Sequence, residues 1–277
     1  MPEITAAAVK RLREKTGLPL MDCKSALQEC GGDEEQAIEW LRKRGAKLMV
    51  SRAGRETSFG RFGVFAGLDQ PAGGIVELKC ESDPVAKNEE FVQLANDLAR
   101  QLALGPGAAT ADELLAQPSP SRPGMTLGEQ KDELMNRIRE VFNVGRFARL
   151  EGPCGGYSHN SGTISGVLLS VRGGSEEAAK DVCMHIAAMR PAALAKEDLD
   201  PNEVDKERAI LREQSLKEGK PENIVDKMVE GRLRSYFAEK VLLEQPFVKE
   251  PKLTVGKYAQ QRHMEIRQYI HWELGKG

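Results

Sequence analysis

Apolar residues recur every three to four positions through the first fifty residues, a spacing typical of short amphipathic helices. Thr5 can cap a first helix that Gly17 ends, and Asp33 with Gln36 can form a capping box before a third. The inward positions of the helices are Val9, Leu12, Cys23, Ala26, Leu27, Cys30, Ile38 and Leu41. The pattern predicts a three-helix module, which is too small to enclose a substrate pocket.

The hydrophobic spacing changes after a basic, polar segment at residues 47–55, which we expect to be a linker. Short apolar runs then indicate strands, and one-sided apolar faces indicate helices. A stretch rich in Pro, Gly, Ala and Ser at residues 105–125 indicates an irregular loop. The expected elements are strands at 62–65 and 74–80 and helices at 91–102 and 127–144.

The second half repeats the order of strand, turn, strand and helix, with a strand expected at 164–171 and a helix at 175–189. The repeat predicts two related subdomains. Two charged helices between residues 200 and 240, joined by a tight turn at 219–221, predict an antiparallel hairpin. The last strand is expected to place Ile266, Ile270, Trp272 and Leu274 on one face and Glu265, Arg267, Tyr269 and Glu273 on the other.

Composition narrows the class of protein. The length of 277 residues suggests roughly two domains at ~150 residues each. Forty Lys and Arg against 42 Asp and Glu leave a net charge of −2, which argues against nucleic-acid binding through bulk positive charge. Five scattered cysteines point to a reducing compartment. Neither a long apolar run nor a leader sequence is visible, so we expect a cytoplasmic protein without membrane contact.

Candidate chemistry is sparse. The chain has no phosphate-binding loop ending in Lys-Ser or Lys-Thr, and glycines at 152–156 are expected to be turns. His185 follows Cys183, but a packed helix face explains the pair better than a soft-metal site. Glu81 and Asp83 stand close together after a strand, where capping of a loop is the simpler interpretation than acid–base catalysis. We therefore expect no cofactor, no metal and no enzymatic activity.

Four ordered segments resemble bacterial translation elongation factor Ts, the nucleotide exchange factor for elongation factor Tu. They cover nearly the whole chain, and their order is that of the family. The segments are residues 12–27, 76–91 and 184–188, and a fourth that runs from 219 through 256.

The resemblance implies an α+β fold with three parts. Residues 1–52 would form a ubiquitin-associated-like three-helix module, and residues 53–150 the N-subdomain of the core. Residues 151–277 would form a related C-subdomain, with the antiparallel helical hairpin inserted at about 200–240. The hairpin could pair with a copy of itself, in a homodimer or a 2:2 complex with the partner, or fold back as a solvated arm.

The resemblance also implies a partner, elongation factor Tu, in its GDP-bound and nucleotide-free states. Leu20 and Met21 are similar in position to residues that contact its nucleotide domain, and Ile138 and His159 resemble further contact residues. The loop Ser82-Asp83-Pro84-Val85 is similar to the family loop that enters near the partner's magnesium site. Disturbing that cation leaves the phosphates less well neutralised, so GDP is released faster. No bond is made or broken.

Pro84 departs from the family pattern, which has phenylalanine as an apolar wedge at this position. Proline removes on the order of 100 Å² of apolar area, at ~25 cal/mol per Å². Three outcomes are open: weaker exchange, a compensating change in the partner, or another residue such as Val85 in the place of the ring. We expect exchange to be weakened but not abolished. A paralogue that binds elongation factor Tu as a scaffold or inhibitor is the alternative that Pro84 favours. A small hydrolase built on Glu81 and Asp83 lacks a nucleophile or a metal site in the sequence.

Overall fold

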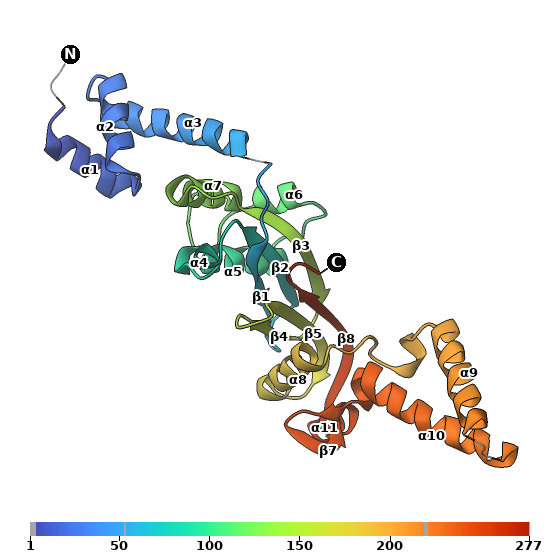
Figure 1. The fold of residues 1–277 in the computed structure, drawn as a ribbon. Helices are drawn as coiled ribbons and strands as arrows, with labels where there is room; N and C mark the ends of the chain where they lie inside the picture. The colour runs from blue at the N-terminus through green and yellow to red at the C-terminus, as the bar shows by residue number, and fades with distance from the viewer. Residues whose placement is uncertain (1–3, 53, 219–220, 277) are drawn as a thin grey trace. The chain divides into compact units, whose positions relative to one another are not determined.

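The fold mixes helices and strands, as expected for an α+β protein. A computed structural model describes residues 4–52, 54–218 and 221–276 (Figure 1). The chain divides into two compact units. The first comprises residues 1–63, 74–148 and 274–277, and the second comprises residues 64–73 and 149–273. The expected domain boundaries after residues 52 and 150 stay a prediction.

The N-terminal helices are α1 (Ala6–Thr16), α2 (Leu20–Glu29) and α3 (Glu34–Arg52). Helix α1 begins and ends at the predicted signals, because the Thr5 hydroxyl accepts from the Ala8 N–H at 3.2 Å and Gly17 has φ 66°. Val9, Leu12, Cys23, Ala26, Leu27, Ala37 and Leu41 form the buried core of the module. The linker expected at 47–55 is wrong over its first part. Lys and Arg favour helix, and α3 continues to Arg52.

The first sheet contains β1 (Phe59–Phe65), β2 (Ala72–Cys80) and β3 (Asn143–Glu151), with β2 in the centre. Helix α5 (Glu89–Leu104) approaches the first two strands at glycines. A Cβ on Gly63 would collide with the carbonyl oxygen of Ala95, and one on Gly74 with that of Ala99. Both expected strands and the expected helix are confirmed, with slightly longer bounds.

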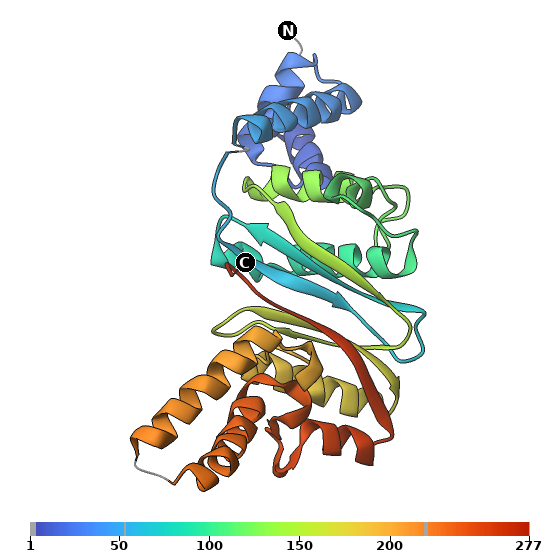
Figure 2. The same ribbon diagram turned by 90° about the vertical axis from the view of Figure 1, so that its right-hand side faces the viewer.

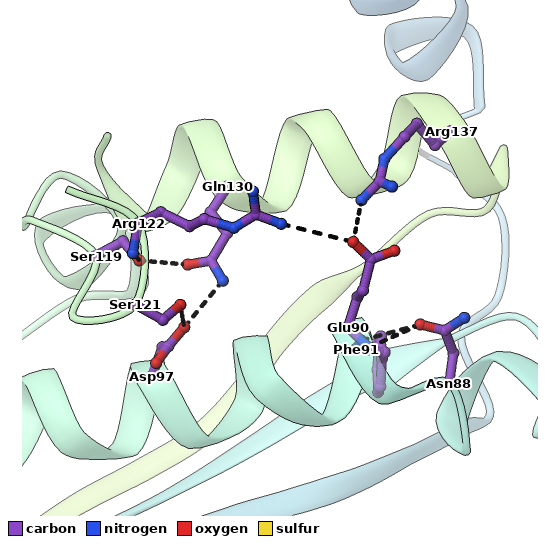
Figure 3. Close-up of polar contacts among 9 residues, drawn as sticks. All are labelled: Asn88, Glu90, Phe91, Asp97, Ser119, Ser121, Arg122, Gln130 and Arg137. Carbon is purple, nitrogen blue, oxygen red and sulfur yellow. Dashed lines mark hydrogen bonds and ion pairs between the residues drawn. The ribbon is translucent and has the colours of Figure 1, made fainter. Parts of the chain in front are cut away.

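Two further helices, α6 (Ala111–Leu115) and α7 (Leu127–Ile138), follow α5 and precede β3 along the chain. Helices α5 and α7 run side by side (Figures 2 and 3). The helix expected over 127–144 is too long, because Arg139 adopts a left-handed conformation with φ 66° and ends α7. The segment expected to be an irregular loop at 105–125 contains α6.

The second sheet contains β4 (Cys154–His159), β5 (Ser165–Gly173) and β8 (Met264–Glu273), and both of its pairings are antiparallel. Helix α8 (Glu176–Met189) packs against β4 and β5. A Cβ on Gly155 would stand 2.7 Å from that of Ala179, so glycine allows the close approach of α8. The prediction of turns at 152–156 is therefore wrong for Gly155 and Gly156, which belong to β4.

A β-bulge corrects the predicted faces of the last strand. Val171 pairs with Ile266 and Ser170 pairs with Gln268, so Arg267 is the extra residue. Beyond the bulge the alternation is inverted. Ile266 and Tyr269 pack against the core that α8 shares with this sheet, whereas Ile270 pairs with Leu168 on the opposite face. Glu273, expected on a polar face, is buried and forms an ion pair with Arg190.

Helices α9 (Pro201–Lys217) and α10 (Glu222–Lys240) pack side by side as the expected hairpin. Val225, Val229 and Leu233 are buried between them, and an Arg212–Asp226 ion pair at 2.6 Å adds to the contact. Gly219 and Lys220, in the predicted turn, lie outside the described residues. The remaining elements of this unit are η1 (Lys196–Asp198), η2 (Leu242–Glu244), β6 (Pro246–Phe247), β7 (Glu250–Thr254) and α11 (Val255–Gln261).

Candidate functional site

The loop singled out in the sequence lies between the central strand β2 and helix α5. Ser82 precedes a single helical turn, α4 (Asp83–Ala86), and Asn88 then caps α5. The Asn88 Oδ1 accepts from the Glu90 N–H at 2.9 Å and from the Phe91 N–H at 3.3 Å (Figure 3). The side chains of Asp83 and Pro84 are exposed on this turn. The loop is thus a short projection that two rigid elements support.

Pro84 fits the conformation of this loop. It is the second residue of α4, within the first helical turn, where a backbone N–H has no partner inside the helix. The neighbouring Asp83 carboxylate pairs with the Lys87 ammonium at 2.6 Å, one turn further along. Proline therefore changes the side chain that the loop presents without disturbing its helical turn.

Glu81 and Asp83 do not converge as a catalytic pair. Glu81 accepts from the Val141 N–H at 2.8 Å and from the Arg55 guanidinium at 3.0 Å, while Asp83 bonds to Lys87. Burial opposes ionisation of Glu81, but the Val141 N–H and Arg55 outweigh it and hold its pKa below the ordinary value. Glu81 is therefore an ionised residue with a structural role, as the loop-capping interpretation predicted.

Cys80, the thiol nearest to Glu81 and Asp83 in the sequence, is not an activated nucleophile. Burial, together with the nearby carboxylates of Glu140, Asp83 and Glu81, raises the pKa of Cys80 to about 12. The thiol is protonated at neutral pH and donates to the Ser82 carbonyl at 3.2 Å. Among residues 4–52, 54–218 and 221–276, no three His, Cys, Asp or Glu side chains gather as metal ligands.

Ser82 has a partner that the sequence analysis did not identify. Its N–H donates to Glu140 Oε2 at 3.1 Å, and its hydroxyl donates to Glu140 Oε1 at 2.6 Å. At the other end of α4, the Arg61 guanidinium donates to the Ala86 carbonyl at 3.3 Å. Glu140 stands two residues after Ile138, which the resemblance had selected, but the sequence does not indicate that its carboxylate reaches Ser82.

The other predicted contact residues are distributed over both units. Leu20 and Met21 are 47% and 64% exposed on the first turn of α2. Ile138 is the half-buried last residue of α7, and the chain after it meets the loop at Ser82. His159 ends β4 in the second unit, with its Nδ1 2.9 Å from the Tyr157 hydroxyl.

The length and hydropathy of the helices bear on membrane insertion. Outside the gaps at 1–3, 53, 219–220 and 277, no helix is long and apolar enough to cross a membrane.

Comparisons with known proteins agree over almost the whole chain. A family model described as Elongation factor TS matches residues 81–276. The chain is 42% identical to an elongation factor Ts of Methylococcus capsulatus, over 99% of this chain and 93% of the relative. It is 41% identical to that of Thioalkalivibrio sulfidiphilus, over 99% and 93% of the two chains. A third relative, from Nitratidesulfovibrio vulgaris, is 38% identical over 99% and 96%.

Proposed function

The chain belongs to the elongation factor Ts family of translation elongation factors, and on this premise we propose that it is a guanine nucleotide exchange factor for elongation factor Tu. It would bind the GDP-bound partner, promote GDP release and leave when a new nucleotide binds. Because the nucleotide-free partner binds the exchange factor best, linkage requires nucleotide rebinding to weaken the complex. The proposal includes no cofactor and no bond-making step.

The observation that carries this proposal is the exposed turn at Asp83 and Pro84, held by its neighbours at both ends. Ser82 is bonded to Glu140 and Ala86 to Arg61, so the exposed residues between them have a defined position. A rigid projection of this kind can displace the groups that support a bound magnesium ion in a partner. Without the cation the diphosphate is less well neutralised, and its dissociation accelerates.

The remaining contact residues extend the proposal to the partner's other surfaces. Exposed Leu20 and Met21 offer an apolar patch for the nucleotide domain of elongation factor Tu. Ile138 would contribute beside the loop, and His159 would contact another domain of the partner. We propose that these contacts form in the cytoplasm. The protein would consist of a three-helix module at residues 1–52 and two core subdomains at 53–150 and 151–277.

A second candidate function is binding to elongation factor Tu as a scaffold or inhibitor without efficient exchange. Pro84 favours it, because proline offers less apolar area than the phenylalanine to which the resemblance points. The helical turn around Pro84 is intact, which supports exchange through Asp83 and Val85 instead.

The test is release of fluorescent GDP from the cognate elongation factor Tu in stopped flow, with and without the chain. We expect clear acceleration by the wild type, and a further increase by Pro84→Phe because the added ring restores apolar contact. Asp69→Ala, on the exposed turn between β1 and β2, is the control and should match the wild type.

Each other outcome has a distinct meaning. Binding without acceleration would establish the scaffold or inhibitor instead. Equal rates for the wild type and Pro84→Phe would contradict the expectation that Pro84 weakens exchange, while leaving the exchange activity itself standing.

A further inference from the structure

We propose that Glu140 is a positioning residue, which holds the Ser82–Val85 loop in the conformation that acts on the partner. This inference rests on the proposed function and deepens it. Glu140 itself need not touch the partner, because its carboxylate is occupied by Ser82.

The geometry is a reciprocal clasp between the end of β2 and the segment after α7. The Glu140 carboxylate accepts from the Ser82 N–H at 3.1 Å, and the Glu81 carboxylate accepts from the Val141 N–H at 2.8 Å. Two successive residues of one segment, Glu81 and Ser82, are thus bonded one to one to two successive residues of the other, Val141 and Glu140. The two segments are about sixty positions apart in sequence, so the clasp is a tertiary contact.

The orientation of the Ser82 hydroxyl shows that Glu140 prevails over a local alternative. Serine at the position before a helix commonly accepts from the first-turn N–H groups. Ser82 occupies that position before α4 but makes no such bond, and its hydroxyl donates to Glu140 Oε1 at 2.6 Å. Hydrogen bonds to a charged acceptor are shorter and stronger than neutral ones, which accounts for the choice.

The clasp matters for function because it fixes the first residue of the loop before the partner arrives. Asp83 and Pro84 follow directly and are exposed, so their direction depends on how Ser82 is held. Arg61 fixes the far end through the Ala86 carbonyl. Ordering the loop in advance directs it at one point of the partner, so a bound partner meets the loop already in the conformation that acts on it.

The segment that carries Glu140 should remain in place when the carboxylate is removed. Val141 and Phe142 are 4% and 1% exposed, and the Phe142 ring contacts Phe91 edge-to-face at 4.9 Å between centroids. The Val141 N–H still bonds to Glu81. Glu140→Ala should therefore fold and release the loop alone.

The experiment compares Glu140→Ala, Glu140→Gln and the wild type in GDP release from elongation factor Tu over a range of exchange-factor concentrations. For Glu140→Ala we expect the saturating rate to fall about tenfold, in line with the loss of hydrogen bonds to a charged group. The concentration of half-maximal effect should change little. Glu140→Gln should recover most of the rate, because its amide can accept from the Ser82 N–H and donate to the hydroxyl.

Three further comparisons separate positioning from a general loss of structure. Asp132→Ala removes an exposed carboxylate from α7 and should match the wild type. Ser82→Ala should lower the saturating rate less than Glu140→Ala, and should lower it no further in the Glu140→Ala background. Amide hydrogen exchange at Ser82, measured without the partner, should accelerate in Glu140→Ala and not in Asp132→Ala.

The results distinguish failure of the role of Glu140 from failure of the proposed function. An unchanged saturating rate in Glu140→Ala, with the wild type active, would overturn the role of Glu140 and leave the proposed function intact. A lowered rate that Glu140→Gln fails to restore, or that Asp132→Ala shares, would also overturn it. A wild type that does not accelerate GDP release would remove the proposed function, and the role of Glu140 with it.

Discussion

His185 shows at the residue scale how a side chain that resembles a metal ligand in sequence is used by the core. The Val248 N–H donates to its Nδ1 at 3.3 Å, so Nε2 carries the proton and donates to Gln245 Oε1 at 2.9 Å. The amide of Gln245 in turn donates to the Glu239 carbonyl at 2.8 Å. Both ring nitrogens are satisfied only while the imidazole is neutral.

Acidification should therefore destabilise the protein through His185. Burial lowers its pKa below the ordinary value of 6.5, although the bond to Gln245 opposes the shift. The unfolded chain binds more protons in the range between 6.5 and the lowered value, so the free energy of unfolding falls as the pH drops through that range. Urea unfolding at pH 7.5 and 5.5 would measure the loss.

The comparison needs a variant without the group and a matched histidine elsewhere. His185→Leu should lose that part of the pH dependence, at a cost of about 2 kcal/mol at pH 7.5 from the orphaned Gln245 and Val248 groups. His263→Asn alters an exposed histidine at a positive φ that asparagine tolerates, and should keep the wild-type slope. The same slope in wild type and His185→Leu would refute the assignment.

At the scale of elements, buried Asp97 joins three parts of the first unit (Figure 3). On α5, its carboxylate accepts from the Ser121 hydroxyl and, at 2.9 Å, from the Gln130 amide of α7. Gln130 also accepts from Ser119 at 2.7 Å. The loop at 105–125, which none of the resembling segments covers, is thereby tied to the helices behind the candidate site.

Removal of this carboxylate should loosen the contact between α5, α7 and the loop. Asp97→Ala leaves the buried amide of Gln130 and the Ser121 hydroxyl without their acceptor, which should cost about 2–3 kcal/mol in the free energy of unfolding. Chemical denaturation would measure it. Asp112→Ala, which removes an exposed carboxylate from α6, should change stability by less than about 0.5 kcal/mol. Equal effects of the two substitutions would mean that Asp97 has no special role.

Sequence reasoning succeeded where local periodicity decides the structure and failed where tertiary contacts do. Helices α5 and α8 could be predicted because their apolar residues repeat at helical spacing. The bulge at Arg267 could not, since one extra residue in a strand leaves no mark on its composition. Gly155 was wrongly predicted to lie in a turn. The position requires glycine because Ala179, on another element, leaves no room for a side chain, and the local sequence does not show that contact.

The candidate site likewise contains residues that the local sequence could locate and one that only a tertiary contact reveals. Ser82 to Val85 could be located from their order in the sequence, and the capping role of Glu81 from the absence of a catalytic partner. Glu140 could not be assigned to Ser82, because nothing local indicates which carboxylate reaches a serine so far away in the chain. Only the register between the end of β2 and the segment after α7 makes that pairing.

At the scale of the whole molecule, the proposed function separates two tasks between surfaces of the first unit. The exposed side chains of Leu20 and Met21 on α2 would supply affinity, because burying apolar area stabilises a complex whatever the state of the nucleotide. The loop at Asp83 and Pro84 would act on the nucleotide site and set the maximal rate. Substitutions in the two regions should therefore change different kinetic parameters.

The combined substitution Leu20→Ser and Met21→Ser tests this separation. Each side chain offers about 1.5–3 kcal/mol of apolar burial, so the concentration of exchange factor for half-maximal GDP release should rise at least about tenfold. The saturating rate should stay close to wild type, the reverse of the result expected for Glu140→Ala. The matched control is Leu104→Ser at the end of α5, where a leucine is 43% exposed against 47% for Leu20. If the double variant lowered the saturating rate at an unchanged half-maximal concentration, the module would be acting on the nucleotide site itself, and the division between affinity and rate would be wrong.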